Sequence, residues 1–77
     1  MNVGEEGKLT WLDAAYKYEV SSSSDVSLAL VESYGKIIQI TDGAVWIAHE
    51  VMDEASDSAF RGVTVIPRVW VKEWQTL

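Results

Sequence analysis

Apolar and polar residues alternate along much of this chain, which is the pattern of half-buried β-strands. The alternation is clear in residues 15–20 (AYKYEV), and residues 36–41 (KIIQIT), 44–52 (AVWIAHEVM) and 62–74 (GVTVIPRVWVKEW) are strand-like as well. These stretches are also rich in β-branched and aromatic residues, which pack well on a pleated surface. The pattern therefore predicts a mainly β protein.

Asp42-Gly43 lies between two of these stretches and has two interpretations. Asp-Gly flanked by apolar runs is a strong signal for a β-hairpin turn. Asp42 could instead cap a helix, giving an α+β fold with helices at about 24–34 and 44–58. The second helix would begin with Val, Trp and Ile in its first turns, which is a poor helix start. We therefore favour the hairpin and a strand after it.

The remaining stretches predict the rest of the architecture. Residues 8–15 (KLTWLDAA) predict a short helix capped by Thr10, and the serine-rich run at 21–25 predicts a connector. Residues 26–35 (VSLALVESYG) predict a strand that reverses at Gly35-Lys36 into the next one. Pro67 cannot donate to a central ladder, so it should mark a bend, a bulge or a split between two strands.

Together these elements give a mobile tail at 1–7 and one domain at 8–77, with a short N-terminal helix and about five strands. Strands adjacent in sequence usually pair, and closing the sheet into a small bent barrel would remove its exposed edges. A single core in a chain of 77 residues without cysteine supplies little stability, so we also expect an oligomer. Four Trp and three Tyr fit buried subunit contacts.

The charge balance limits the partners. Twelve acidic and six basic residues give a net charge of -6, which disfavours non-specific nucleic-acid binding driven by Lys and Arg. No apolar run approaches the roughly 20 residues that cross a bilayer. The polar start MNVGEEGK lacks the features of a signal or transit peptide, so a cytoplasmic protein with no membrane association is expected.

Candidate chemistry is sparse. His49-Glu50 begins a sequence similar to the zinc motif H-E-x-x-H, but Asp53 stands where the second His would be. The acids around 50–57 lack the spacing and glycine of a calcium loop. There is no nucleophile elbow, P-loop or dinucleotide glycine pattern. We therefore expect no catalytic residue, metal or cofactor, and no enzyme activity.

The order of elements resembles the Sm-like family of bacterial Hfq and of archaeal and eukaryotic Lsm proteins, with a divergent, phage-type member as the nearest comparison. The resemblance covers nearly all of residues 8–74: TWLDAA as the helix, then AYKYEV, VSLALVES, KIIQIT-DG-AVWIAHEV, RGVTVIP and RVWVKEW as the strands. It implies a five-stranded, SH3-like bent barrel. Ile66-Pro67-Arg68 stands where the family has Ile-Arg-Gly, and the loop around Gly35 lacks the family's Asn.

The resemblance implies a non-enzymatic module that forms a cyclic homo-oligomeric ring through its last two strands. The interface residues would be Val63, Val65, Val69, Trp70, Val71 and Trp74. An aromatic side chain with nearby cations is the minimal apparatus for single-stranded RNA, so pore-lining loops carrying Tyr34, Lys36 and Arg68 are the candidate RNA site. The alternative is a small acidic protein that inhibits a host nucleic-acid-binding factor, in which the carboxylates would line one continuous face.

Overall fold

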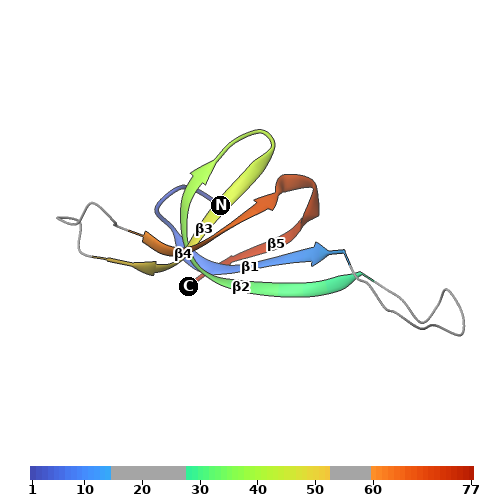
Figure 1. Cartoon of the computed structure of the whole chain (residues 1–77), viewed down its shortest axis with the longest axis horizontal. Helices are drawn as coiled ribbons and strands as arrows, with labels where there is room; N and C mark the ends of the chain where they lie inside the picture. The colour runs from blue at the N-terminus through green and yellow to red at the C-terminus, as the bar shows by residue number, and fades with distance from the viewer. Residues whose placement is uncertain (15–27, 53–59) are drawn as a thin grey trace, which may run out of the picture.

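The computed structural model describes residues 1–14, 28–52 and 60–77, and these form one antiparallel sheet of five strands (Figure 1). The elements are β1 (Glu6–Asp13), β2 (Ala29–Ile40), β3 (Ala44–Val51), β4 (Phe60–Pro67), the 3-10 turn η2 (Arg68–Trp70) and β5 (Val71–Thr76). The strand order is β4-β3-β2-β1-β5. The prediction of a mainly β protein is confirmed.

The predicted N-terminal helix is wrong, because residues 6–13 form β1 instead. β1 pairs with β2 on one side and with β5 on the other, so it is a central strand of the sheet. Its side chains already alternate in the sequence: Leu9 is fully buried, whereas Lys8 and Thr10 are partly exposed. This period of two, satisfied by two neighbouring strands, outweighs the local helix-capping signal at Thr10.

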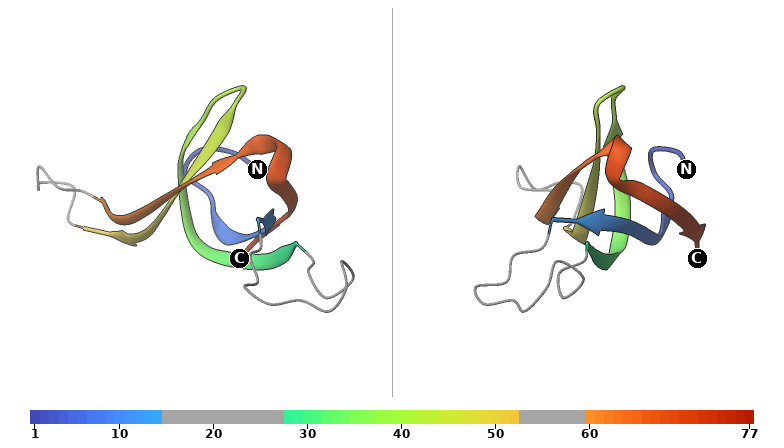
Figure 2. Two further views of the ribbon diagram at one scale, coloured as in Figure 1. Left: turned by 45° about the vertical axis from the view of Figure 1, so that its right-hand side comes forward. Right: turned by 90° about the vertical axis from the view of Figure 1, so that its right-hand side faces the viewer.

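The predicted reversal at Gly35-Lys36 is also wrong. β2 continues through both residues and curves along its length (Figure 2). Its first part pairs with β1 as far as Lys36, and its last part pairs with β3 from Lys36 onward. Gly35 therefore marks the point where one long strand changes partner, with a register shift shortly after it between Ile37 and Gln39.

The hairpin at Asp42-Gly43 is confirmed and joins β2 to β3. The backbone N–H of Thr41 donates to the carbonyl of Ala44 at 2.9 Å. The hydroxyl oxygen of Thr41 accepts from the N–H groups of Gly43 and Ala44, at 3.3 and 3.1 Å. Gly43 has no positive φ, so the Thr41 side chain, rather than a left-handed glycine, organises this turn.

The two helices of the alternative α+β fold are wrong wherever the structure describes them, since residues 29–34 and 44–51 lie in strands. β4 extends the meander by pairing with β3. Pro67 ends β4 and caps η2, as its missing N–H predicts, and the chain then turns into β5. The N–H of Arg68 donates to the Gly43 carbonyl at 3.0 Å, which ties η2 to the β2–β3 turn.

β5 returns to pair with β1, so β4 and β5 are the two edges of the sheet. No pairing joins β4 to β5 within the described ranges, and the predicted closure of a barrel is therefore not found there. The curved sheet instead packs one face around a core. The core cluster consists of the buried side chains of Leu9, Ile37, Val45, Ile47 and Ile66, and Trp11, Ile40, Val71 and Trp74 pack against it.

Several predicted elements have a different outcome. The tail predicted at 1–7 includes the beginning of β1, and Gly4 and Glu5 exchange backbone hydrogen bonds with Ile37 at 2.8 and 2.9 Å. The strand predicted at 15–20, the connector at 21–25 and most of the acidic stretch after Met52 lie outside the described residues.

Candidate functional site

β4 forms an apolar edge of the sheet. Val63 and Val65 are 42% and 50% exposed, and Phe60 at the beginning of the strand is 41% exposed. Because paired residues in an antiparallel sheet share a face, the register places Val63 beside Ala48 and Val65 beside Trp46 on the face opposite Val45 and Ile47, called the outer face here, although Ala48 itself is buried. An edge strand also presents unpaired backbone groups. In the part of the chain that the structure describes, β4 therefore combines exposed apolar side chains with a backbone edge that no other strand pairs.

β5 forms a more polar edge. Lys72, Glu73 and Gln75 are exposed, whereas Val71 and Trp74 pack against the core. Charged side chains on an edge strand discourage pairing with another chain. The two edges of this sheet therefore differ in chemistry.

The six predicted interface residues divide into three pairs. Val63 and Val65 lie exposed on β4, and Val69 and Trp70 lie exposed on η2, with Val69 at 90%. Val71 and Trp74 belong to β5 and support the core. Four of the six are therefore accessible to a partner strand, and two are occupied inside the molecule.

Tyr34 and Lys36, predicted to line a loop, lie in the middle of β2 on the outer face. Tyr34 is 54% exposed and lies opposite Lys8, and Lys36 lies opposite Glu6. Lys8 is 3.9 Å from Glu32, and the Tyr34 hydroxyl donates to the same carboxylate at 3.4 Å. The cations beside Tyr34 thus have acidic neighbours, which weakens their attraction for phosphate.

Arg68 lies elsewhere in the molecule. Its guanidinium donates to the Thr41 carbonyl at 3.4 Å, beside the β2–β3 turn. Thr41 follows the last residue of β2, whereas Tyr34 and Lys36 lie near the middle of that strand. Within one copy of the chain, the three predicted RNA-binding residues do not form a single site.

The outer face has mixed charge. The registers place Glu6, Glu32, Glu50 and Glu73 on it, and Lys8, Lys36 and Arg61 lie among them. Glu50 is directly opposite Arg61. Among the described residues, acids and bases therefore alternate on this face, unlike the continuous carboxylate row that the inhibitor alternative predicts.

His49 connects three strands at the point where β3 separates from β2. Its Nδ1 lies 2.7 Å from the Tyr34 carbonyl oxygen and its Nε2 lies 2.9 Å from the Thr64 hydroxyl. A carbonyl oxygen only accepts, so Nδ1 carries the hydrogen and, in the neutral ring, Nε2 accepts from Thr64. Both ring nitrogens are therefore engaged in holding β2 and β4 to β3.

A hollow of about 300 Å³ lies beside His49, lined by Glu6, Gly7, Gly35, Lys36, Ala48, His49, Val51 and Leu77. Its lining side chains include one carboxylate, of Glu6, and one ammonium group, of Lys36, and the imidazole of His49 is already bonded at both nitrogens. Nowhere in residues 1–14, 28–52 and 60–77 do three His, Cys, Asp or Glu side chains come together as a metal site would require. The hollow presents no free nucleophile–base pair.

Trp11 makes two contacts beside the core, a ring stack and a hydrogen bond. The indoles of Trp11 and Trp70 stack with centroids 6.3 Å apart and planes 10° apart, and Trp11 Nε1 donates to the buried Ser33 hydroxyl at 3.0 Å. This stack places η2 over the end of β1. Trp70, predicted as an interface residue, is thus partly engaged within its own chain.

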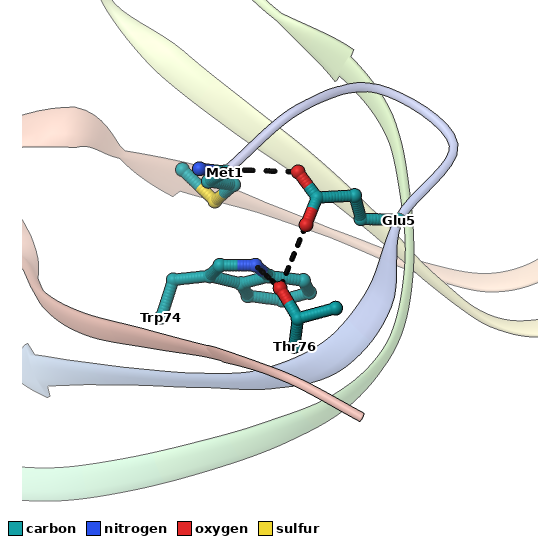
Figure 3. A network of polar contacts seen from close by, with 4 residues as sticks. All are labelled: Met1, Glu5, Trp74 and Thr76. Carbon is teal, nitrogen blue, oxygen red and sulfur yellow. Dashed lines mark hydrogen bonds and ion pairs between the residues drawn. The ribbon is translucent and has the colours of Figure 1, made fainter.

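A polar network joins the two ends of the chain (Figure 3). Trp74 Nε1 donates to the Thr76 hydroxyl at 2.9 Å, and that hydroxyl donates to Glu5 Oε2 at 2.7 Å. The Met1 amino group lies 4.0 Å from the other carboxylate oxygen. The hydrogen bond from Thr76 holds the pKa of Glu5 below its ordinary value of 4.5. Residues 71 positions apart make this contact, and no local sequence pattern predicts it.

No helix in the described segments is long and apolar enough to cross a membrane. Comparison with known proteins adds no relative: no family model, no curated protein and no solved structure matches this chain.

Proposed function

We propose that this chain is a non-enzymatic, Sm-like module that assembles with other copies of itself through the free edges of its sheet. The observation that carries the proposal is the apolar edge β4, where Val63 and Val65 are exposed and where, among the described residues, only β3 pairs with the strand. Such an edge is a template for pairing with a further strand. Self-association would pair this edge with a further strand and bury additional apolar surface, which stabilises a small domain.

The Sm-like part of the proposal comes from the resemblance of the sequence, and the mainly β fold is compatible with it. The chain meanders from β1 to β4 and then returns through a short turn to place β5 beside β1, which leaves β4 and β5 as the two edges of the sheet. The resemblance also implies a ring, in which β4 of one copy pairs with β5 of the next. A head-to-tail contact of this kind uses both free edges and closes by rotation.

The solution mass tests self-assembly. Light scattering and native mass spectrometry should give a multiple of the 8.6 kDa chain mass at micromolar concentration. Val65→Lys, which places a charge on the exposed edge, should shift the protein toward monomer. Leu30→Lys is the matched control, because Leu30 is 64% exposed on β2, away from both edges. An unchanged 8.6 kDa species at all concentrations contradicts the proposal.

Besides self-assembly, single-stranded RNA is a candidate ligand. It is favoured by the exposed ring of Tyr34, which lies between Lys8 and Lys36 on the outer face. An aromatic ring can stack on a base while lysines contact phosphates. Labelled oligo(U) and oligo(A) titrated at low salt should bind, and Tyr34→Ala should weaken binding while Arg68→Gln, which lies elsewhere, should not. Binding that is absent, or equal in Tyr34→Ala, contradicts this assignment.

A further inference from the structure

The two edge strands of the sheet, β4 and β5, differ in charge and polarity. β4 reads FRGVTVIP and contains no acidic residue, whereas β1, β2, β3 and β5 each contain at least one. β5 exposes Lys72 and Glu73, whereas β4 exposes Phe60, Val63 and Val65 and has its one exposed charge, Arg61, near its beginning. A charged strand is a poor partner for an apolar one, because pairing would place Lys72 and Glu73 beside valines.

We propose that β4 pairs with β4 of a second copy, antiparallel and around a two-fold axis, in place of a head-to-tail contact between β4 and β5. This inference rests on the proposed self-assembly, but it replaces the ring that the resemblance implies with a two-fold contact. An isologous contact requires a surface that is complementary to itself. β4 meets that requirement, and the pairing would extend the two sheets into one.

The sequence of β4 favours one register. Side chains on the same face must lie opposite each other. The axis therefore has to lie midway between one residue of β4 and the same residue of the other copy. With the axis at Thr64, Val63 lies opposite Val65 of the partner subunit, and both exposed valines of each copy are covered. Arg61 then lies opposite Pro67 of the partner subunit, at the end of the ladder, where a missing N–H removes the fewest hydrogen bonds.

The local geometry permits this register. Val63 to Ile66 pair regularly with β3, so this segment is an extended, regular strand. The left-handed residue Gly62, with φ +62°, lies just before it. The Thr64 hydroxyl is bonded to His49 on the core side, which fixes the strand from within its own chain. The edge is therefore held in place before a partner binds.

The charge of the chain predicts how the affinity of the dimer depends on salt. Two copies that each carry a net charge of -6 repel each other, and the strand in contact contributes no carboxylate of its own. Salt screens the remaining repulsion. The dimer should therefore become tighter as sodium chloride is raised.

Cysteine cross-linking of the full chain tests the register, because the native sequence has no cysteine. A tagged Val65→Cys variant is mixed with an equal amount of untagged Val63→Cys, Glu73→Cys or Leu30→Cys and oxidised mildly. The two-fold register predicts cross-linking of the 65/63 mixture, whereas the ring predicts cross-linking of the 65/73 mixture. The 65/30 mixture is the control for random collision.

The mass is measured in parallel. A species of two chains with selective 65/63 cross-linking, whose dissociation constant rises about tenfold or more in Val65→Lys, supports the two-fold contact. A larger ring with selective 65/73 cross-linking overturns the two-fold contact and keeps self-assembly. A monomer without selective cross-linking, with circular dichroism showing an intact β fold, overturns both proposals.

Discussion

Gly7 of β1 and Gly35 of β2 lie directly opposite each other in the antiparallel ladder. A Cβ on Gly7 would lie 2.7 Å from Cζ2 of Trp74 and would overlap the Gln75 carbonyl. A Cβ on Gly35 would overlap the Ala48 carbonyl and lie 3.1 Å from Ile47 Cγ1. This pair of glycines lets β5 approach β1 and β3 approach β2 at the place where β2 changes partner.

Gly35→Ala should therefore destabilise the protein. The methyl group meets backbone of β3, which cannot move without breaking ladder hydrogen bonds, so a loss of about 2–3 kcal/mol is expected. Urea unfolding followed by tryptophan fluorescence measures it. Gly43→Ala is the control, because no atom lies within 4 Å of its added Cβ and its φ is not positive. Equal stability of Gly35→Ala and the native chain contradicts the close approach.

His49→Ala should cost about 1 kcal/mol of the free energy of unfolding, because it removes two partly exposed hydrogen bonds and leaves the Tyr34 carbonyl to water. Thr64→Val removes only the Nε2 partner and should cost less. Nitrogen chemical shifts of the neutral ring should show the hydrogen on Nδ1. A neutral ring with its hydrogen on Nε2 would rule out the described orientation.

The ionisation of Glu5 should make the free energy of unfolding depend on pH. Its pKa in the folded protein is lowered by the Thr76 hydrogen bond, so its contribution is fully present above the ordinary value of 4.5. The contribution is lost as pH falls through the lower folded value. Unfolding at pH 7 and pH 3 should therefore show a smaller pH-dependent loss in Glu5→Gln than in the native chain. Glu73→Gln serves as control; an identical loss in all three proteins argues against the network.

Trp70→Ala should remove the stacked pair with Trp11 and cost about 1 kcal/mol beyond the lost apolar burial. Near-parallel indoles at this separation couple their transitions, so the near- and far-ultraviolet circular dichroism should change in Trp70→Ala. Trp70→Phe keeps a ring on Trp11 and should retain most of the stability. An unchanged spectrum in Trp70→Ala would mean that the indoles do not stack in solution.

Local patterns predicted much of this fold. Strand-like runs rich in β-branched and aromatic residues identified β3, β4 and β5, the Asp42-Gly43 pair identified a hairpin, and Pro67 marked the break between the last two strands. These signals depend on residues close together in the chain, whose propensities and turn chemistry act locally. The absence of a metal cluster or triad pattern left interaction surfaces as the candidate sites.

Contacts between distant residues decided the rest. Residues 8–15 carry both a helix cap and a period of two, and only the presence of β2 and β5 on either side makes β1 a strand. Gly35 has the appearance of a turn residue, but its contact with Ala48 makes it a bend within β2. Lys36 is an isolated cation in the sequence, and only the ladder shows that Glu6 lies opposite it. The sequence by itself determined that this chain forms β-strands and where several of them end. Only the tertiary structure decided which strands pair, which edges stay free and which charges meet, because those depend on contacts across the sheet.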